Sequence, residues 1–316
     1  WLKLIMFFRP FRRHAFTVGV GAVLCLAPKP TRVSHSLDRG SLADSHVTLY
    51  QFESCPFCRK ARSVLDYCRV PYNVVEVNPL SKAELKEVAP DYKKVPVLAV
   101  EGPADTVQVR DSKAIVQAVL TAVNAGSSGG PSKRPPVIPA TAAMWPSKET
   151  EAMGAYLDSL SEVEREWILW TDRVLVQLIV VNIYRNLSES SETFDYLLTH
   201  PAFSMFWKYA GHASGTVVMN AVAMIRKRKF GLADERQALY DTLNAFVECL
   251  EGDFLGGSKP CRADFNVYGI LRSVQSFTTE ADMFANSNIG GWYERMQHAV
   301  GTSCARNTIA RGPQPA

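Results

Sequence analysis

The sequence predicts two domains of different class, a small α/β domain followed by an all-α domain. Three observations lead to this prediction. Between residues 46 and 123, short apolar strand patterns alternate with helix patterns. A stretch rich in Gly, Ser and Pro then follows over residues 124–147 without a sustained period. Beyond it, helical periodicity prevails. Domains commonly contain about 100–200 residues, so this chain of 316 residues has room for both.

The elements of the α/β domain follow one another as strand, helix, strand, helix, strand, strand and helix. Their expected ranges are 46–52, 56–68, 72–77, 81–89, 94–102, 106–111 and 111–123. Pro56 stands at the start of the first helix, where proline is best tolerated. Gly102 and Pro103 mark the turn between the last two strands. This order predicts a small mixed sheet with helices packed on it.

The second half of the chain shows helix patterns throughout. In residues 164–184 apolar side chains recur at steps of three and four, and almost every residue from 174 to 181 is apolar. We expect this helix to be buried on several sides. Further helices are expected over roughly 201–229, 233–251, 262–278 and 291–299.

The first residues differ from the rest of the chain. They carry six basic residues but no acidic residue before Asp38, and they include the apolar run 15–27. Such a run spans roughly 20 Å as a helix, less than the hydrocarbon core of a bilayer of about 30 Å. The pattern is typical of an organellar transit peptide or of a signal or membrane anchor, with a disordered tail as the alternative. We therefore divide the chain into a targeting or anchor segment, an α/β domain, a linker and a helical domain, at 1–44, 45–124, 125–150 and 151–310. No later segment is expected to cross a membrane.

Bulk composition excludes some classes of protein. The net charge of +4 is modest, and no Arg-rich helix interleaved with aromatic residues occurs, so we expect no nucleic-acid partner. The basic run 226–229 is expected to be the solvated end of a helix. Seven cysteines at irregular spacing in a long chain argue against a secreted disulfide framework and favour a reducing compartment.

The chemistry points to Cys55 and Cys58, which stand in the sequence CPFC where the first strand pattern changes to a helix. A sulfur at the start of a helix faces unpaired backbone N–H groups and the positive end of the helix dipole, and both stabilise the thiolate. Cys55 precedes Pro56 and so occupies the cap position, whereas Cys58 lies one turn inside. We assign Cys55 as the nucleophile and Cys58 as the resolving thiol. The neighbouring Arg59, Lys60 and Arg62 are expected to raise the local positive potential.

Two other roles for the pair are a metal half-site and a structural pair. A structural zinc ion usually takes four ligands, often as two paired sets, and no second Cys-X-X-Cys or His pair follows at a suitable spacing. No metal is therefore expected. A purely structural pair of buried thiols is the other alternative.

Two further stretches favour a small peptide ligand. Asp111 and Ser112 open a helix, where they could act as simple caps. The same helix start could instead attract a carboxylate while the Asp111 side chain accepts from an ammonium group. An α-amino acid head offers both groups, and the γ-glutamyl end of glutathione is one. In KKVPV, Pro96 and Val95 precede an apolar strand, where Val95 could pair through its backbone with an extended ligand.

The stretches LYQFESCPFC, PYNVVEVNPLSKAELK, YKKVPVL and DSKAIV resemble the N-terminal domains of glutaredoxins and glutathione transferases. Together with FLGGSKPCRADFNVYGILRSV and WYERM, they resemble the family of type 2 membrane-associated prostaglandin E synthases over residues 47–300. This resemblance implies a thioredoxin/glutaredoxin-like domain joined to a helical domain of the glutathione transferase type. It also implies a cis Val95–Pro96 bond facing the reactive cysteine.

The resemblance also carries functional expectations. It implies a homodimer that binds glutathione, holds haem through the glutathione sulfur and isomerises prostaglandin H2, a hydrophobic lipid peroxide, to prostaglandin E2. Cys55 matches the essential cysteine and Cys58 its partner. The positions that match glutathione contacts are Phe52, Phe57, Val95, Pro96, Asp111 and Ser112. Animal members carry a tyrosine three residues before the essential cysteine, so its hydroxyl is missing at Phe52.

Alternative functions are a glutaredoxin-like thiol–disulfide oxidoreductase and a membrane-attached binder of glutathione and haem. The N-terminal segment predicts attachment to an organellar membrane, of the mitochondrion or the Golgi, with a soluble form facing the cytosol as the alternative.

Overall fold

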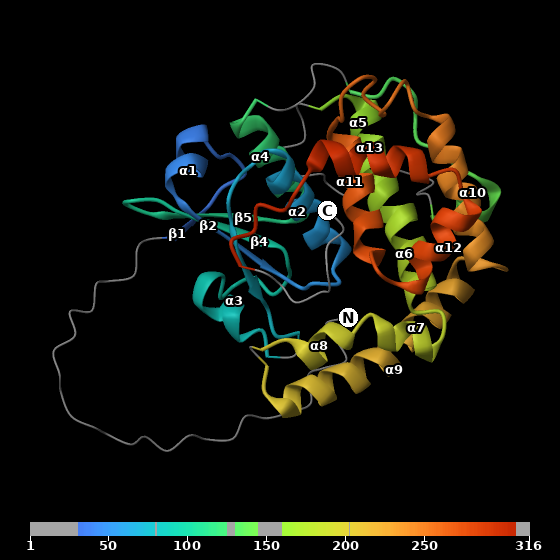
Figure 1. Ribbon diagram of the computed structural model, residues 1–316, viewed down its shortest axis with the longest axis horizontal. Helices are drawn as coiled ribbons and strands as arrows, with labels where there is room; N and C mark the ends of the chain where they lie inside the picture. The colour runs from blue at the N-terminus through green and yellow to red at the C-terminus, as the bar shows by residue number, and fades with distance from the viewer. Residues whose placement is uncertain (1–30, 80, 125–129, 145–159, 202, 308–316) are drawn as a thin grey trace.

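The computed structural model describes residues 31–79, 81–124, 130–144, 160–201 and 203–307, and it places a five-stranded sheet beside a group of helices (Figure 1). The strands are β1 Thr31–Val33, β2 His46–Gln51, β3 Asn73–Glu76, β4 Val97–Glu101 and β5 Thr106–Arg110. Their order in the sheet is β1-β5-β4-β2-β3. β4 runs antiparallel to both of its neighbours, whereas β2 and β3, and likewise β1 and β5, are parallel. The predicted small mixed sheet is confirmed.

The sheet contains one strand that the sequence pattern did not predict. β1 pairs with β5, Thr31 opposite Thr106, and the short helix α1 Arg39–Asp44 leads on to β2. Residues 31–44 therefore belong to the α/β fold, although the expected boundary of this domain was residue 45. Three exposed residues at a sheet edge show no alternation of apolar and polar side chains that a sequence pattern could reveal. The apolar run 15–27 lies outside the described residues.

The two faces of the sheet are covered by different helices. Val47 and Leu49 of β2 point into the main core, which also includes apolar side chains of α2 Pro56–Tyr67 and α4 Ser112–Ala122. Side chains of a strand alternate between faces. Tyr50 accordingly packs on the other side, in a smaller cluster that includes Leu85 of α3 Ala83–Val88.

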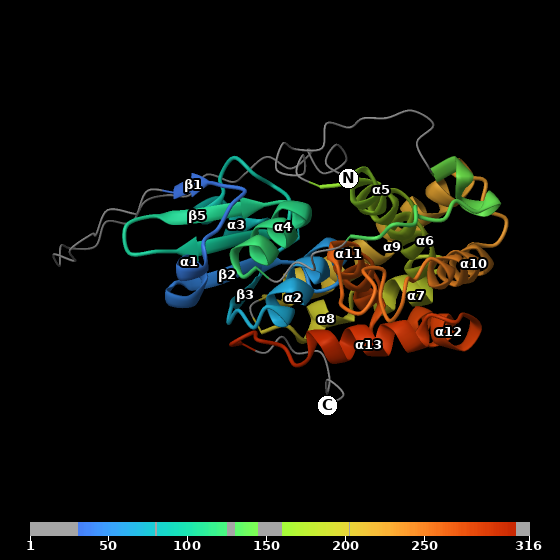
Figure 2. The same cartoon turned by 90° about the horizontal axis from the view of Figure 1, so that it is seen from above.

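The helical half packs against the sheet half, on the side of α2 (Figures 1 and 2). Its elements are η1 Pro139–Met144, α5 Glu162–Trp170, η3 Thr171–Leu175, α6 Val176–Ile183, α7 Leu187–Glu192, α8 Asp195–Thr199, α9 Met205–Lys229, α10 Glu235–Glu248, α11 Arg262–Leu271, η4 Arg272–Val274, α12 Thr278–Asn286 and α13 Gly290–Val300. The five predicted helical regions are helical, and α7, α8 and α12 are additional short helices. Within the expected linker, residues 130–144 lie along the helical half: the indole N–H groups of Trp167 and Trp170 donate to the carbonyls of Lys133 and Pro136.

The helix predicted over 164–184 is interrupted. It begins as α5, passes through the π-helical segment η3 and continues as α6. A π segment inserts a residue into a helix and re-aims the side chains around it. Among the described residues no single helix is long and apolar enough to cross a membrane. The two helical segments Glu162–Ile183 and Leu187–Thr199 together have the length and composition of a membrane span, by those two criteria only, and they are bent by 106° relative to each other.

The two halves share one continuous core. Helix α11 packs directly on α2, where the rings of Tyr67 and Phe265 lie 4.7 Å apart. The C-terminal segment after α13 returns to the sheet half, and Tyr72 forms a parallel bridge with Ala305. The helix that carries both cysteines is therefore held from the sheet on one side and from the helical half on the other.

Candidate active site

Cys55 lies where β2 passes into α2. Its backbone is extended, with φ −79° and ψ 119°, and it forms the N-cap of α2, with Pro56 at the first helical position. The Cys55 side chain is half-buried, whereas Cys58 is fully buried. The structure thus places the two thiols as the sequence predicted, with the outer one accessible and the inner one shielded. Their catalytic roles remain predictions.

The two thiols have opposite pKa shifts. A hydrogen bond from the Cys58 thiol lowers the pKa of Cys55, and burial opposes this effect. The backbone N–H groups of Cys58 and Phe57 and the charge of Lys60 lower it further. Burial and the neighbouring Cys55 sulfur raise the pKa of Cys58 well above its ordinary value. Cys55 is therefore the better thiolate and Cys58 the proton-bearing donor.

Two of the three basic residues that follow Cys55 are paired with the carboxylate of Glu53. Arg59 and Arg62 both form buried ion pairs with Glu53. Their charges are thereby compensated. The charge of Lys60 lowers the pKa of Cys55. The contribution expected of the two arginines is thus reduced by pairing with Glu53, which the sequence pattern did not indicate.

Lys60 is a buried cation held between the two halves of the molecule. Its side chain is fully buried, and its Nζ lies 2.5 Å from Oδ1 of Asp172 in η3. The second oxygen of Asp172 lies 3.4 Å from Nζ of Lys113. Lys60 also lies over the ring of Phe57, 5.4 Å from its centroid. Asp172 of the π-helical segment η3 is therefore the counter-ion of Lys60, whose charge lowers the pKa of Cys55.

A buried polar network supports the loop before Cys55. The backbone N–H of Glu53 donates to Glu76 Oε1 at 2.7 Å. Gln51 Nε2 donates to both carboxylates, at 3.0 Å to Glu53 and 3.2 Å to Glu76. Burial, with the negative charge of Glu53, raises the pKa of Glu76 to about 8. Glu76 also raises the pKa of Cys58 through its charge, so this network acts on the inner thiol.

The Val95–Pro96 peptide bond is cis, which confirms the expectation drawn from the resemblance. The ladder between β2 and β4 ends with Tyr50 opposite Val97, so Val95 and Pro96 lie just beyond it, beside the end of β2 that leads to Cys55. Phe52 packs its side chain on the smaller apolar cluster. Its backbone N–H, rather than its side chain, donates to Cys58. The hydroxyl missing at this position is therefore not needed for that hydrogen bond.

Asp111 is the N-cap of α4, and its Oδ1 accepts from the Lys113 N–H at 2.8 Å. It has a positive φ of 78°, which turns the chain sharply into the helix. Ser112 is buried, and Phe57 is half-buried and packs against the main core. The capping role of Asp111 is thus present in the structure. Contact of Asp111, Ser112 and Phe57 with glutathione remains a prediction.

Sequence reasoning missed Asp172 and Glu76 as parts of the site. Asp172 was visible as an acidic residue shortly before a run of apolar residues, a position where a charge needs a partner. Glu76 was visible as a carboxylate in a strand that is otherwise largely apolar. Neither pattern says which residue is the partner, because both contacts join elements that are distant in the sequence.

Comparisons with known proteins show what this chain is similar to. Residues 49–127 match the family model described as "Glutathione S-transferase, N-terminal domain". Prostaglandin E synthase 2 of Danio rerio is 33% identical over 310 residues, covering 90% of this chain and 81% of that protein. Prostaglandin E synthase 2 of Mus musculus is 33% identical over 275 residues, covering 80% and 70%. A solved structure of glutaredoxin 2 from Salmonella typhimurium in complex with glutathione has a TM-score of 0.47 and 15% identity, covering 81% of this chain and 95% of that one.

A mixed sheet with a Cys-X-X-Cys helix start and a cis proline, followed by a helical half, defines a protein of the glutathione transferase and glutaredoxin-like class. Within this class, the sequence identity of 33% to the two prostaglandin E synthases 2, along most of this chain, decides the family. The chain belongs to the prostaglandin E synthase 2 family.

Proposed function

We propose that this chain is a glutathione-dependent prostaglandin E synthase that isomerises prostaglandin H2 to prostaglandin E2, with Cys55 as the catalytic residue. Membership of the family supports the reaction. The observation that carries the assignment of Cys55 is its half-buried sulfur at the start of α2, whose pKa is lowered by Cys58 and by backbone N–H groups. This is the group in the described structure best prepared to act as a thiolate at neutral pH.

The isomerisation can be written around this thiolate. The Cys55 sulfur attacks one peroxide oxygen, so that an S–O bond forms and the O–O bond breaks. The second oxygen leaves as an alkoxide and takes up a proton. A base then removes the hydrogen from the carbon that bears the sulfur-bound oxygen, the C=O double bond forms, and the S–O bond breaks to return the thiolate. No net oxidation occurs, as an isomerisation requires.

The residues around Cys55 fit glutathione in part. The backbone of Val95 lies beyond the ladder of β4, where an extended peptide could pair with it. Asp111 and the start of α4 suit the charged γ-glutamyl head, although Oδ1 of Asp111 already caps the helix. Ser112 is buried, so a ligand would reach it only at the start of α4. When bound, glutathione would supply a second sulfur nucleophile beside Cys55.

The finer expectations belong to the same proposal. Haem would be held through the glutathione sulfur, and a haem absorbance that depends on added glutathione tests this. The described residues contain no group of three or more His, Cys, Asp or Glu side chains that could hold a metal ion. Attachment to an organellar membrane through the N-terminal segment, of the mitochondrion or the Golgi, and assembly as a homodimer complete the proposal.

A second function, thiol–disulfide exchange, is favoured by the geometry of Cys58. This thiol is buried directly behind Cys55 and donates a hydrogen bond to its sulfur. It is therefore placed to attack a mixed disulfide that forms on Cys55, which would release the bound thiol and leave a Cys55–Cys58 disulfide. External glutathione would then reduce that disulfide.

One experiment separates the two functions. The full chain, Cys55→Ser and the control Cys249→Ser, a half-buried cysteine of the helical half, are assayed for prostaglandin E2 formation and for reduction of a glutathione mixed disulfide. We expect Cys55→Ser to lose both activities and Cys249→Ser to keep them. Prostaglandin E2 formation that persists in Cys55→Ser would rule out this cysteine as the isomerase catalyst. Disulfide reduction without isomerisation by the wild-type chain would favour the second function.

A further inference from the structure

The isomerisation proposed above needs an acid and a base besides the Cys55 thiolate. An acid protonates the alkoxide that leaves the broken peroxide, and a base then removes a hydrogen from carbon. Such a group has to lie close to the two thiols, carry a titratable atom and be open to a substrate. Of the described residues around the thiols, Tyr92 meets these three conditions best.

The two carboxylates of the buried polar network do not meet them. Both oxygens of Glu76 are engaged, since Oε1 accepts from the Glu53 N–H and Oε2 from Gln51 Nε2. The Glu53 carboxylate is paired with Arg59 and Arg62. Both glutamates are buried. A substrate therefore reaches neither of them in the folded protein.

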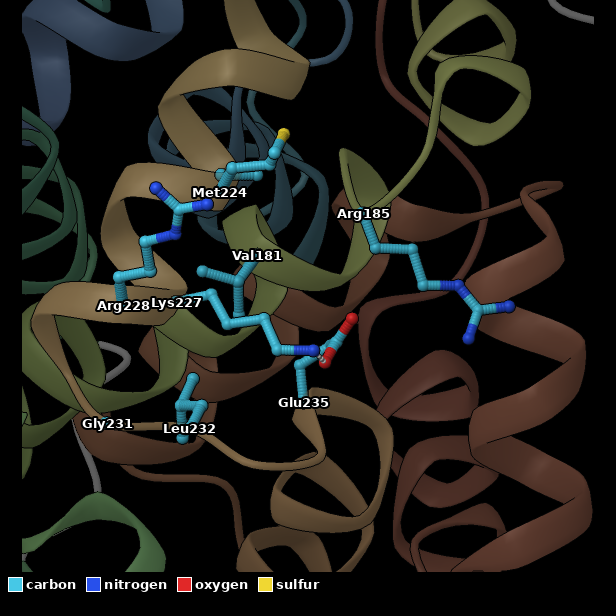
Figure 3. Close-up of a pocket in the computed structure, with 9 residues that line it drawn as sticks. Val181, Arg185, Met224, Lys227, Arg228, Gly231, Leu232 and Glu235 are labelled. Carbon is cyan, nitrogen blue, oxygen red and sulfur yellow. Dashed lines mark hydrogen bonds and ion pairs between the residues drawn. The ribbon is translucent and has the colours of Figure 1, made fainter.

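The hollow between α6, α9 and α10 does not meet the conditions either (Figure 3). Its volume is about 390 Å³, and all the residues that line it belong to the helical half. Its carboxylate, Glu235, forms an ion pair with Lys227. Arg185 and Arg228 are cations that do not exchange a proton at neutral pH. Arg228 belongs to the basic run 226–229 and is exposed, as predicted for a solvated helix end.

Tyr92 stands between α3 and β4, where packing holds its ring beside two of the predicted glutathione contacts. It packs on the smaller apolar cluster, on which Phe52 and Val95 also pack. The guanidinium of Arg110 lies over its ring, 5.3 Å from the centroid. Two hydrogen bonds to Asp91, of 2.7 and 2.8 Å, fix that guanidinium. The ring is therefore held between the apolar cluster and a fixed cation.

The Tyr92 hydroxyl is available to a substrate. The residue is half-buried, and within the described part of the chain its hydroxyl forms no hydrogen bond. Burial raises the pKa of this phenol, the negative charges of Asp111 and of the Cys58 sulfur raise it further, and Arg110 opposes them. The hydroxyl thus lies within electrostatic reach of the start of α4 and of the inner thiol. It is protonated at neutral pH and, once ionised, is a strong base.

We propose that Tyr92 is both the acid and the base of the isomerisation, an inference that rests on the proposed function. Its hydroxyl gives a proton to the alkoxide that leaves when the Cys55 sulfur attacks the peroxide. The phenolate that remains takes a proton from the carbon that bears the sulfur-bound oxygen. The C–H electron pair forms the C=O bond, and the electron pair of the S–O bond returns to the thiolate.

One residue suffices because the two proton transfers occur at neighbouring atoms. The alkoxide oxygen and the sulfur-bound oxygen were the two ends of one peroxide bond. Tyr92 ends the cycle protonated, as it began, so no external proton is consumed and no oxidant is needed.

The test compares Tyr92→Phe with Tyr50→Phe in the full chain. Tyr50 packs on the same apolar cluster, and burial raises its pKa too. The charges that add to this effect are those of Glu101 and Glu87 rather than those of the thiol site. Tyr50→Phe therefore removes a similar hydroxyl at a distance from the reaction.

Three measurements are made on each variant: formation of prostaglandin E2 at saturating glutathione, alkylation of Cys55 by iodoacetamide, and binding of glutathione by calorimetry. Tyr92→Phe should lower kcat by about 10²–10⁴-fold, the usual contribution of general acid–base catalysis. The alkylation rate and the affinity for glutathione should stay close to those of the wild type. Tyr50→Phe should keep all three properties.

The products give a readout that loss of packing would not move. Without the base, the S–O adduct on Cys55 persists until glutathione attacks its sulfur. The S–O bond then breaks, the oxygen takes up a proton, and the substrate leaves as a diol instead of a ketone. A second glutathione reduces the mixed disulfide that remains on Cys55. Tyr92→Phe should therefore raise the ratio of diol to prostaglandin E2, whereas Tyr50→Phe should not.

Full prostaglandin E2 formation by Tyr92→Phe would overturn the inference, and so would a slower reaction with an unchanged product ratio. An equal loss in Tyr50→Phe would assign the effect to packing of the cluster. A loss in His200→Gln but not in Tyr92→Phe would move the base to His200, a half-buried side chain that the charge of Glu53 reaches. Absence of prostaglandin E2 formation by the wild type would remove the proposed isomerase function itself.

Discussion

Gly269 of α11 lies directly against the backbone of Lys60 in α2. A Cβ on Gly269 would stand 2.7 Å from the Lys60 nitrogen and closer still to its Cα, which real structures do not tolerate. The helix of the reactive thiol and the central helix of the other half are therefore in backbone contact. The absence of a side chain at one position allows Lys60 to reach Asp172 while its helix carries Cys55 and Cys58.

Replacing Gly269 with Ala should destabilise the protein. The added methyl group meets backbone rather than a flexible side chain, so α2 and α11 must separate. Overpacking of this kind costs about 1–3 kcal/mol of unfolding free energy, more than the gain of about 1 kcal/mol that Ala brings to a helix. Denaturant unfolding should show a lower midpoint.

The control for this change is Gly290→Ala, at the first position of α13, where a Cβ would meet open space. This variant should unfold at the wild-type midpoint or above it. If Gly269→Ala unfolds like Gly290→Ala, the close contact between α2 and α11 does not exist in solution.

Much of this arrangement was predictable because it is local in the sequence. The change of period from strand to helix at Cys55, the proline at the first helical position and the cap at Asp111 all depend on neighbouring residues. The positions of β2, α2 and α4 were therefore predicted within a few residues. The cis state of Pro96 was expected from family resemblance alone.

The parts that were missed depend on contacts that a periodic pattern does not show. The partner of Arg59, Glu53, stands only six residues earlier, but an exposed arginine and a paired one look alike in a helix pattern. β1 is three residues long, and its partner β5 lies more than 70 residues away. Asp172 was assigned to a continuous helix because a π segment has the same composition as the helix around it.

Lys60 should control the ionisation of Cys55. Its charge lowers the pKa of this thiol, so Lys60→Met should raise that pKa. Asp172→Asn breaks the same ion pair but removes a negative charge instead, so it should leave the pKa of Cys55 unchanged or lower it. The rate of alkylation by iodoacetamide as a function of pH measures both. A rise of the pKa in both variants would indicate that loosening of α2, rather than charge, is responsible.

The Cys58 thiol should be the main stabiliser of the Cys55 thiolate. Its hydrogen bond is the largest cause of the lowered pKa, and Cys58→Ala removes the donor. The pKa of Cys55 should then rise toward that of a free cysteine, about 8.5. Cys58→Ser keeps an O–H donor and should retain most of the lowering. Absorbance of the thiolate at varied pH reports both values, and equal values for Ala and Ser would exclude the hydrogen bond as the cause.

Glu76 should make the stability of the protein fall as pH rises. Burial raises its pKa in the folded state to about 8, whereas in the unfolded chain it is near 4.5. Below the lower value the carboxyl is protonated in both states, and the contribution of this group is at its most favourable. Between the two values the unfolded chain loses the proton that the folded protein keeps, so unfolding becomes easier. Above about 8 both states are ionised and the loss is complete.

The Glu76→Gln variant isolates this effect, because an amide does not titrate. A pKa that is higher by one in the folded protein than in the unfolded chain corresponds to about 1.36 kcal/mol of unfolding free energy. The wild type should therefore lose a few kcal/mol relative to the variant between pH 4.5 and 8. Gln51, whose Oε1 has no hydrogen-bond partner among the described atoms, can accept from the new amide and keep the network closed.

Urea unfolding at several pH values measures this difference between the wild type and Glu76→Gln, with the exposed Glu87→Gln as control. The control should follow the wild type at every pH, because Glu87 is exposed and lies outside the buried network of Gln51, Glu53 and Glu76. A difference between wild type and Glu76→Gln that stays constant with pH would mean that Glu76 is ionised in the folded protein. Its neighbour Glu53 would then share the two buried arginines with it, since two adjacent buried carboxylates can both ionise only where cations compensate them.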